Sequence, residues 1–248
     1  INNNKLRYKI NNKKFYKIKG RKIISIKRRS KYLLINLNHN LTILAHLGMT
    51  GIFSIIDRKK KRYKTSFYYL IKKNKSKHDH LTLYLNKGFK LIYNDVRKFG
   101  FLKLLKSNNI HQSKHLKFLG PEPLTKEFNL NYAKKYFLHK KTTIKDSLMN
   151  QKFVAGLGNI YSNEVLFLCK LNPRRISDNI KKKELFNIIK FTKKILKTSI
   201  TQGGSSIKNF ANAEGKNGNF QEKFKVYNRE KSKCSRKNCL GIIQKTFI

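Results

Sequence analysis

The feature that most constrains the fold of this chain is a change of hydrophobic period at one stiff segment, Gly120-Pro121-Glu122-Pro123. Before it, apolar residues alternate over 31–37 and 80–86, which is typical of half-buried strands. After it, they recur at helical spacing, most clearly over 185–200. Proline fixes φ and restricts the residue before it, so a regular element does not easily continue through this segment. The pattern predicts an α+β chain whose domain boundary lies at residue 120.

The β part shows further strand signals. A second apolar stretch covers 41–56, and Asn86-Lys87-Gly88 is a turn signal whose hairpin partner is 89–94. The basic stretch Arg58–Lys77 predicts a long solvated loop or an irregular hairpin. In the helical part we expect helices over 125–139, near 144–149, from about residue 160 and over 185–200, the last ended by Gly203 and Gly204.

Charge narrows the class of partner. The 248 residues include 58 Lys and Arg against 12 Asp and Glu, a formal charge of +46. Such a protein repels itself unless a polyanion neutralises it, and nucleic acid does so with release of counterions. The abundance of Lys, Asn, Ile, Phe and Tyr is also expected from an AT-rich genome. Charge alone therefore favours nucleic acid without separating a repair enzyme from a ribosomal protein.

Localisation signals are few. No apolar run is long enough to cross a membrane, and the start carries no signal-peptide stretch. Three cysteines are too few for a disulfide framework, so we expect an intracellular, cytoplasmic protein with no membrane partner. Because the chain opens on Ile1 and not on Met, we expect it to be a fragment.

One segment combines a glycine turn with two helices. Residues 151–167 read QKFVAGLGNIYSNEVLF, with Gly156 and Gly158 before a helix that begins near Ile160. A helix N-terminus presents free N–H groups that suit a phosphate, and Asn159 adds a side-chain donor. An ordinary helical hairpin fits the same glycines.

The full string resembles the helix–two-turn–helix of the formamidopyrimidine-DNA glycosylase and endonuclease VIII superfamily. Other segments match in the same order: 28–34 (RRSKYLL), 45–51 (AHLGMTG), 95–100 (DVRKFG), 119–124 (LGPEPL), 203–206 (GGSS) and 212–216 (NAEGK). Segment 95–100 differs from the family's DPRRFG by a Val and a Lys. The resemblance implies a β-sandwich catalytic domain over 1–120, a helix–two-turn–helix domain over 121–222 and part of a zinc β-ribbon over 223–248.

The resemblance also implies roles for single residues. Lys31 would be the proton donor in β-elimination near the abasic sugar. Met49, Arg97 and Phe99 would fill the hole left by a flipped base, with Arg97 facing the opposite cytosine. The phosphate contacts that it implies are His78, Lys141 and, less specifically, Lys152 and Asn159. His80, two residues after His78, invites a metal interpretation that no further ligand supports, so we expect His80 to be structural.

Four residues separate Cys234 from Cys239, which is within zinc-ligand spacing, and the resemblance makes the two cysteines half of a structural zinc site. Cys169 is better explained as a buried small hydrophobe. The family's nucleophile is an N-terminal proline followed by glutamate, and its second elimination uses an arginine of the ribbon. Neither lies in this sequence, so we expect both beyond its ends.

The function implied is base-excision repair of oxidised purines in double-stranded DNA by a monomeric glycosylase with lyase activity. The endonuclease VIII branch, which prefers oxidised pyrimidines, is the nearest alternative, and LGPEPL and GNIYSNE argue against it. A DNA-binding fragment without catalysis is a second alternative. A generic RNA-binding protein is a third, and it explains none of the ordered motifs.

Overall fold

The computed structural model describes residues 1, 6–64, 76–205 and 220–246. They divide into two compact units, one of residues up to Lys117 and one of Phe118–Ser205 with the segment from Phe220 onward. The α+β class is confirmed, because antiparallel sheets make up the first unit and helices the second.

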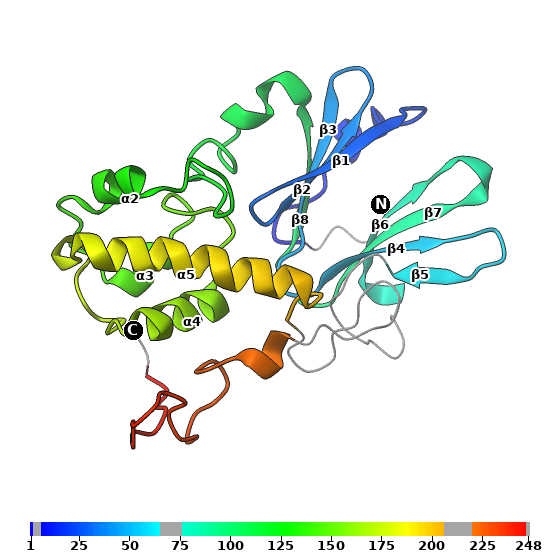
Figure 1. Ribbon diagram of the computed structural model, residues 1–248. Helices are drawn as coiled ribbons and strands as arrows, with labels where there is room; N and C mark the ends of the chain where they lie inside the picture. The colour runs from blue at the N-terminus through cyan, green and yellow to red at the C-terminus, as the bar shows by residue number, and fades with distance from the viewer. Residues whose placement is uncertain (2–5, 65–75, 206–219, 247–248) are drawn as a thin grey trace. The chain divides into compact units, whose positions relative to one another are not determined.

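The first unit contains two four-stranded antiparallel sheets, both drawn in Figure 1. One has the order β1-β2-β3-β8 and the other β5-β4-β7-β6. The strands of the first are β1 (Ile23–Arg29), β2 (Tyr32–Leu37), β3 (Leu41–His46) and β8 (Phe101–Lys106). Those of the second are β4 (Gly51–Ile56), β5 (Arg62–Lys64), β6 (Asp79–Tyr84) and β7 (Lys90–Asp95). The apolar stretch 41–56 is thus two strands, which belong to different sheets.

Side chains of both sheets form one core. Ile35, Ile43 and Leu102 come from the first sheet, and Leu81 and Tyr93 from the second. The short helix α1 (Asn12–Tyr16) adds Phe15 to this core. The predicted hairpin is present, since β6 and β7 pair on either side of the turn Asn86–Gly88. Of the predicted loop Arg58–Lys77, residues 65–75 lie outside the described residues.

The second unit has four α-helices among its described residues: α2 (Leu130–Phe137), α3 (Ile144–Met149), α4 (Asn159–Cys169) and α5 (Lys182–Thr201). Helix α2 is shorter than the predicted 125–139. Its Asn129 side chain accepts from the Tyr132 N–H and caps the helix there. At the other end, Leu138 leaves the helical region and His139 has a φ of 58°.

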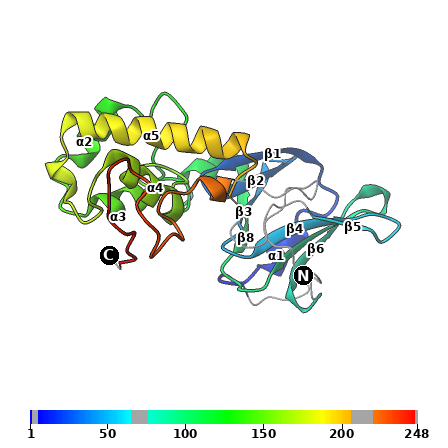
Figure 2. The ribbon, with the colours of Figure 1, turned by 60° about the horizontal axis from the view of Figure 1, so that its bottom comes forward.

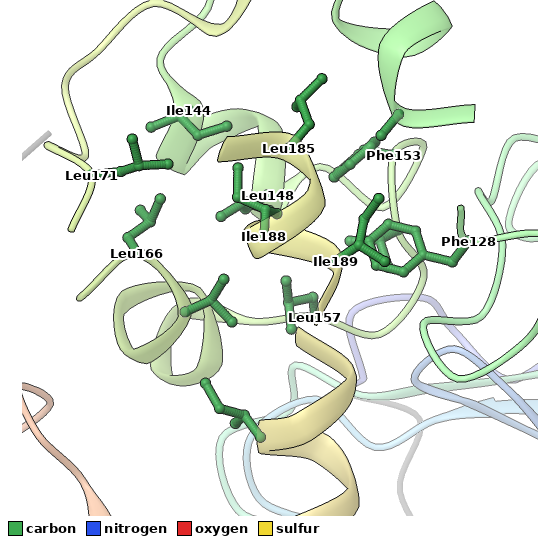
Figure 3. Packing of buried hydrophobic residues seen from close by; sticks show 14 of the residues in the cluster. Phe128, Ile144, Leu148, Phe153, Leu157, Leu166, Leu171, Leu185, Ile188 and Ile189 are labelled. Atoms are coloured by element: carbon green, nitrogen blue, oxygen red, sulfur yellow. The ribbon is translucent and has the colours of Figure 1, made fainter. Parts of the chain in front are cut away.

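The core of this unit lies between α4 and α5, which run beside each other in Figures 1 and 2. Figure 3 shows Ile188 and Ile189 of α5 facing Leu148, Leu157 and Phe153. Each of these five side chains is at most 9% exposed. Full burial of such a side chain stabilises a fold by about 1.5–3 kcal/mol, so these contacts contribute much of the stability of this unit.

The C-terminal segment follows as the short 3-10 helix η5 (Phe220–Lys223) and then irregular chain with one bridge, Lys233↔Ile242. Figure 1 draws it in orange and red below α4. Within the described ranges, none of the helices is both long and apolar enough to span a bilayer.

Candidate nucleic-acid interface

Two loops of the first unit, residues 47–50 and 96–100, are joined by the carboxylate of Asp95. The Thr50 hydroxyl donates to Asp95 Oδ1, and the Gly100 N–H donates to Oδ2 at 2.8 Å. The Tyr93 hydroxyl donates to the same Oδ2 at 3.4 Å. Asp95 is 0% exposed, so these hydrogen bonds form away from water and hold the ends of both loops at a fixed spacing.

The backbones of the two loops also touch. Gly48 has a φ of 62°, and a Cβ built on it would lie 2.7 Å from the Gly100 nitrogen and 2.8 Å from the Phe99 carbonyl carbon. A side chain at residue 48 would therefore be strained and would force the loops apart.

Met49, Arg97 and Phe99 project from these loops. Met49 is 55% exposed and Phe99 is 46% exposed, so the ordinary interpretation of such residues as core does not apply. The Arg97 guanidinium lies 4.8 Å from the centroid of the Phe99 ring, and the Arg97 N–H donates to the Thr50 Oγ1 at 2.9 Å. The structure thus brings the three predicted residues together on two adjacent loops.

Lys31 lies in a turn and not within a strand. Arg29 pairs with Tyr32 across β1 and β2, so Ser30 and Lys31 must reverse the chain. Ser30 has a φ of 55°, and its carbonyl accepts from the Arg28 guanidinium at 3.0 Å. Lys31 remains solvent-exposed, yet the protein atoms around its ammonium desolvate it in part and lower its pKa.

His46 is a site residue that sequence reasoning missed. It pairs with Tyr32 across β2 and β3, next to the turn that carries Lys31. Desolvation lowers the pKa of His46, and the charges of Lys31 and Arg7 lower it further. Its Nδ1 accepts from the Gly48 N–H at 3.1 Å, so the neutral ring carries its proton on Nε2. The sequence signal that could have indicated His46 is its place in the matched segment 45–51, which also contains Met49.

The two histidines before β7 have different environments. His80 is 0% exposed and donates through Nε2 to the Asp95 carbonyl oxygen at 2.9 Å, which confirms its structural role. His78 ends the short 3-10 helix η1 (Ser76–His78) and is partly exposed. No group of three or more metal-ligating side chains occurs among the residues that the structure describes.

In the second unit, the side chain of Gln151 holds the predicted glycine turn. Its Oε1 accepts from the Gly156 N–H at 2.7 Å, and its Nε2 donates to the Leu157 carbonyl at 2.8 Å. Helix α4 then begins at Asn159, after Gly158, with no side-chain cap. The first N–H groups of a helix have no partner within it, so this end can receive an anion.

Three predicted phosphate contacts lie on the surface of this unit. Asn159 is exposed, and its Oδ1 accepts from Asn163 at 3.4 Å, so its amide NH2 is the group able to donate to a phosphate. The Lys152 ammonium lies 5.3 Å from the centroid of the Phe118 ring. Lys141 forms an ion pair with Asp178 at 2.7 Å while its side chain stays 82% exposed.

Glu164 was also missed. This α4 residue is 4% exposed. Its Oε2 accepts from the Lys225 N–H at 2.8 Å, and its Oε1 accepts from the N–H groups of Val226 and Tyr227 at 3.0 and 2.9 Å. One carboxylate thereby fixes the C-terminal segment to α4. No sequence signal indicates a partner about 60 residues away.

Cys234 and Cys239 are close to each other on the C-terminal segment. The Cys234 N–H donates to the Gly241 carbonyl at 2.8 Å, which closes the turn between them. A hydrogen bond from the Gly241 backbone, followed by one with Cys234, lowers the pKa of the exposed Cys239 thiol. By contrast, burial raises the pKa of Cys169 to about 12, so this thiol stays protonated. The predicted segment 212–216 and Ser206 lie outside the described residues.

Comparisons with known proteins agree with this geometry. The N-terminal domain model of formamidopyrimidine-DNA glycosylase matches residues 1–102, and the helix–two-turn–helix domain model of the same enzyme matches residues 119–211. The chain belongs to the formamidopyrimidine-DNA glycosylase family. It is 34% identical to the Rickettsia felis member over 97% of this chain and 82% of that protein. For a Bradyrhizobium member the identity is 36%, over 88% and 76%.

Solved structures of the family are similar as well. A Lactococcus lactis variant in complex with Fapy-dG-containing DNA superposes with a TM-score of 0.78 at 31% identity, over 92% of this chain and 78% of that one. A complex of the Lactococcus lactis protein with DNA containing an abasic site gives 0.77 at 32% identity, with the same shares covered. The antiparallel β domain and the helix–two-turn–helix domain predicted from the family resemblance are therefore shown.

Proposed function

We propose that this protein excises oxidised purines from double-stranded DNA and cleaves the strand at the resulting abasic site. The observation that carries the proposal is the exposed group Met49, Arg97 and Phe99, held on two loops that Asp95 and Gly48 lock together. A base that undergoes chemistry must leave the stack, which costs a few kcal/mol. Side chains that are already in place when the base leaves can fill the vacated space and offset this cost, because they lose little conformational freedom at that step.

Arg97 is the residue that reads the opposite base. Its side chain lies over Phe99 while its own N–H is bound to Thr50, so the guanidinium starts from a restricted position. A guanidinium in such a place donates to the acceptors of an unpaired base and discriminates among bases by about 1–3 kcal/mol. We assign cytosine as its preferred partner.

Lys31 is the proton donor of the elimination. A lysine serves in proton transfer when its pKa is brought down toward the working pH, and partial desolvation moves the pKa of Lys31 in that direction. His46 beside it is kept neutral in part by the Lys31 charge. The region thus offers one ammonium and one neutral N–H donor to the sugar and its phosphate.

The residues that contact the DNA phosphates are His78, Lys141, Lys152 and Asn159. All four are at least partly exposed, and the last three come from the second unit. Phosphate contacts position a protein on DNA without reading sequence, which suits an enzyme that searches for rare lesions.

A structural zinc ion fits the C-terminal segment in part. Cys234 and Cys239 hydrogen-bond to each other, and the lowered pKa of Cys239 favours the thiolate that zinc requires. They would supply two of the roughly four ligands of a structural site, and the ion would stabilise the ribbon without taking part in the reaction. Metal analysis of protein expressed from the complete reading frame, beside a Cys234→Ser variant, tests this assignment.

The decisive experiment for catalysis is borohydride trapping. Protein expressed from the complete reading frame is incubated with duplex DNA that contains 8-oxoguanine opposite cytosine, and the reduced covalent complex is quantified. A trapped complex separates a lyase from a DNA-binding protein. Binding of the lesion duplex without any trapped product would remove the lyase assignment and leave a binding function only.

The role of Arg97 has its own test. We expect Arg97→Ala to lower the preference for cytosine over other opposite bases by about 1–3 kcal/mol. Lys98→Ala is the matched control, because it removes the same charge from the next residue of the same exposed loop. Equal losses of Arg97→Ala with every opposite base would refute its reading role.

A further inference from the structure

The ion pair between Lys141 and Asp178 couples a predicted phosphate contact to a carboxylate. Lys141 Nζ donates to Asp178 Oδ2 at 2.7 Å. The lysine side chain is 82% exposed, whereas that of Asp178 is only 18% exposed. The carboxylate is thus a fixed part of the surface, and the ammonium is the part that DNA can reach.

The backbone around this pair is rigid. The segments 140–144 and 175–178 run antiparallel and form the bridge Thr143↔Ile176. Three further hydrogen bonds join them: Ile144 N–H to Arg175 O at 2.8 Å, Ser177 N–H to Thr142 O at 3.0 Å, and Asp178 N–H to Lys140 O at 3.1 Å. The buried hydroxyls of Ser147 and Ser177, 2.8 Å apart, lie beneath them. These hydrogen bonds fix the backbone of Asp178 beside that of Lys140, which keeps the carboxylate within reach of Lys141.

The other acids of this region are engaged elsewhere. Glu184 pairs with Arg175 at 2.6 Å, and the Asp146 carboxylate accepts from the Thr143 hydroxyl at 2.7 Å. The whole chain has only 12 acidic residues against 58 Lys and Arg. Asp178 is thus unusual on this basic surface, because its carboxylate is held against a lysine that is proposed to bind phosphate.

We propose that Asp178 acts as a built-in competitor of DNA phosphate at Lys141 and so limits the sequence-independent affinity of this protein for DNA. The inference rests on the proposed role of Lys141 as a phosphate contact. A strongly basic glycosylase that held every phosphate with full charge would dissociate slowly from undamaged DNA. Neutralising one contact shortens the time spent at each undamaged site.

The competition holds whichever way the ammonium moves. If Lys141 keeps its bond to Asp178, a phosphate oxygen on the same ammonium lies within about 6 Å of the carboxylate, and the two negative charges repel. If Lys141 leaves, the Asp178 carboxylate loses this ion pair. Its Oδ1 is already buried with no hydrogen-bond partner among the described residues, so the loss is not easily replaced.

The experiment is a double-mutant cycle on an undamaged duplex, read as the dissociation constant at several salt concentrations. Asp178→Asn keeps an acceptor for the lysine but removes the charge. We expect it to tighten binding about two- to fivefold, the range of an exposed ion pair. The dependence of log K on log salt should steepen by up to about 0.9. With Lys141→Ala already present, Asp178→Asn should have little effect.

Asp146→Asn is the matched control, because it makes the same change in net charge on the same surface without touching Lys141. An equal gain from Asp146→Asn, or an equal gain from Asp178→Asn with and without Lys141, would show a general charge effect and overturn the inference. If Lys141→Ala alone does not weaken binding, the assignment of Lys141 as a phosphate contact fails first. Asp178→Ala and a thermal melt of each variant separate a loss of folding from a change in binding.

Discussion

Asp95 in the first unit and Glu164 in the second are both buried carboxylates that fix a distant part of their own unit, but their partners differ in kind. Two of the three donors to Asp95 are hydroxyl groups, from Thr50 and Tyr93. All three donors to Glu164 are backbone N–H groups. A hydroxyl rotates and can also accept, whereas a backbone N–H can do neither.

This difference indicates how much change each site tolerates. An amide in place of Asp95 can turn its NH2 toward a hydroxyl. An amide in place of Glu164 must point its NH2 at a backbone N–H, so two donors face each other in a buried place. The attachment of residues 225–227 to α4 should therefore tolerate an amide less well than the junction at Asp95 does.

The largest expected effect comes from Glu164→Gln. Because one backbone donor is left facing another in a buried place, we expect the free energy of unfolding to fall by about 3 kcal/mol. Denaturant titration measures it. Glu222→Gln, a change at an exposed acid of the same unit, is the control and should cost little. A loss for Glu164→Gln below about 1 kcal/mol would contradict the role of the Glu164 carboxylate in fixing the C-terminal segment to α4.

Gly48→Ala tests whether close packing, in addition to Asp95, holds the two loops. We expect a loss of stability of about 2 kcal/mol, because the new Cβ meets backbone atoms and the residue keeps a positive φ. Gly20→Ala separates these causes, since Gly20 has a φ of 72° but no atom within 4 Å of an added Cβ. If both variants lose the same stability, the contact with Gly100 contributes nothing.

Asp95→Asn sharpens the comparison directly. We expect a loss of about 1.5 kcal/mol, smaller than that of Glu164→Gln, because the Thr50 hydroxyl can reverse its role. The same titration measures both variants. Thr50→Ala combined with Asp95→Asn should show non-additive losses, since both act on one hydrogen-bonded group. A larger loss for Asp95→Asn than for Glu164→Gln would invert our ranking.

The smallest expected effect is a pH dependence confined to the first unit. Burial lowers the pKa of His115 to about 4, helped by the Lys103 ammonium 2.9 Å from its Nε2. Between pH 6.5 and 4 the unfolded chain binds a proton that the folded ring does not, so stability falls as the pH falls.

Water still reaches the His115 ring, so we expect the wild-type protein to lose about 1 kcal/mol more than His115→Gln over that interval. Unfolding titrations at both pH values measure the difference. Parallel losses in the two proteins would show that the folded ring titrates like an exposed imidazole.

Most of the fold could be predicted from the sequence because its signals are local. Alternating residues placed β2 and β6, and Asn86-Lys87-Gly88 placed the turn between β6 and β7. The start of α2 could not be predicted from period alone, since it depends on the side-chain cap of Asn129. The position of Lys31 in a turn depends on the register of β1 with β2, which period does not fix.

The candidate site was predictable only where a family motif or a short spacing carried it. Arg97 and Phe99 lie two residues apart, and Cys234 and Cys239 lie on either side of one turn. Because each pair is so near in sequence, its members stay close in space. Glu164 was missed as an organising residue because its donors lie 61–63 residues away, and Asp95 because the Thr50 hydroxyl that it binds lies 45 residues away. His46 was missed because Lys31, whose charge acts on it, lies in the turn between β1 and β2. A buried carboxylate that accepts hydrogen bonds from backbone N–H groups produces no periodic pattern in the sequence.

The amide of Gln151 has a consequence for how freely this protein could be redesigned. It is at once an acceptor for Gly156 and a donor to Leu157, and it also donates to the Met149 carbonyl at 3.0 Å. Glutamate offers no donor and lysine offers no acceptor, so neither reproduces both functions. A library around this turn should therefore keep Gln151 together with Gly156, whose φ of 90° suits glycine. A library that keeps both glycines but varies residue 151 should lose the start of α4.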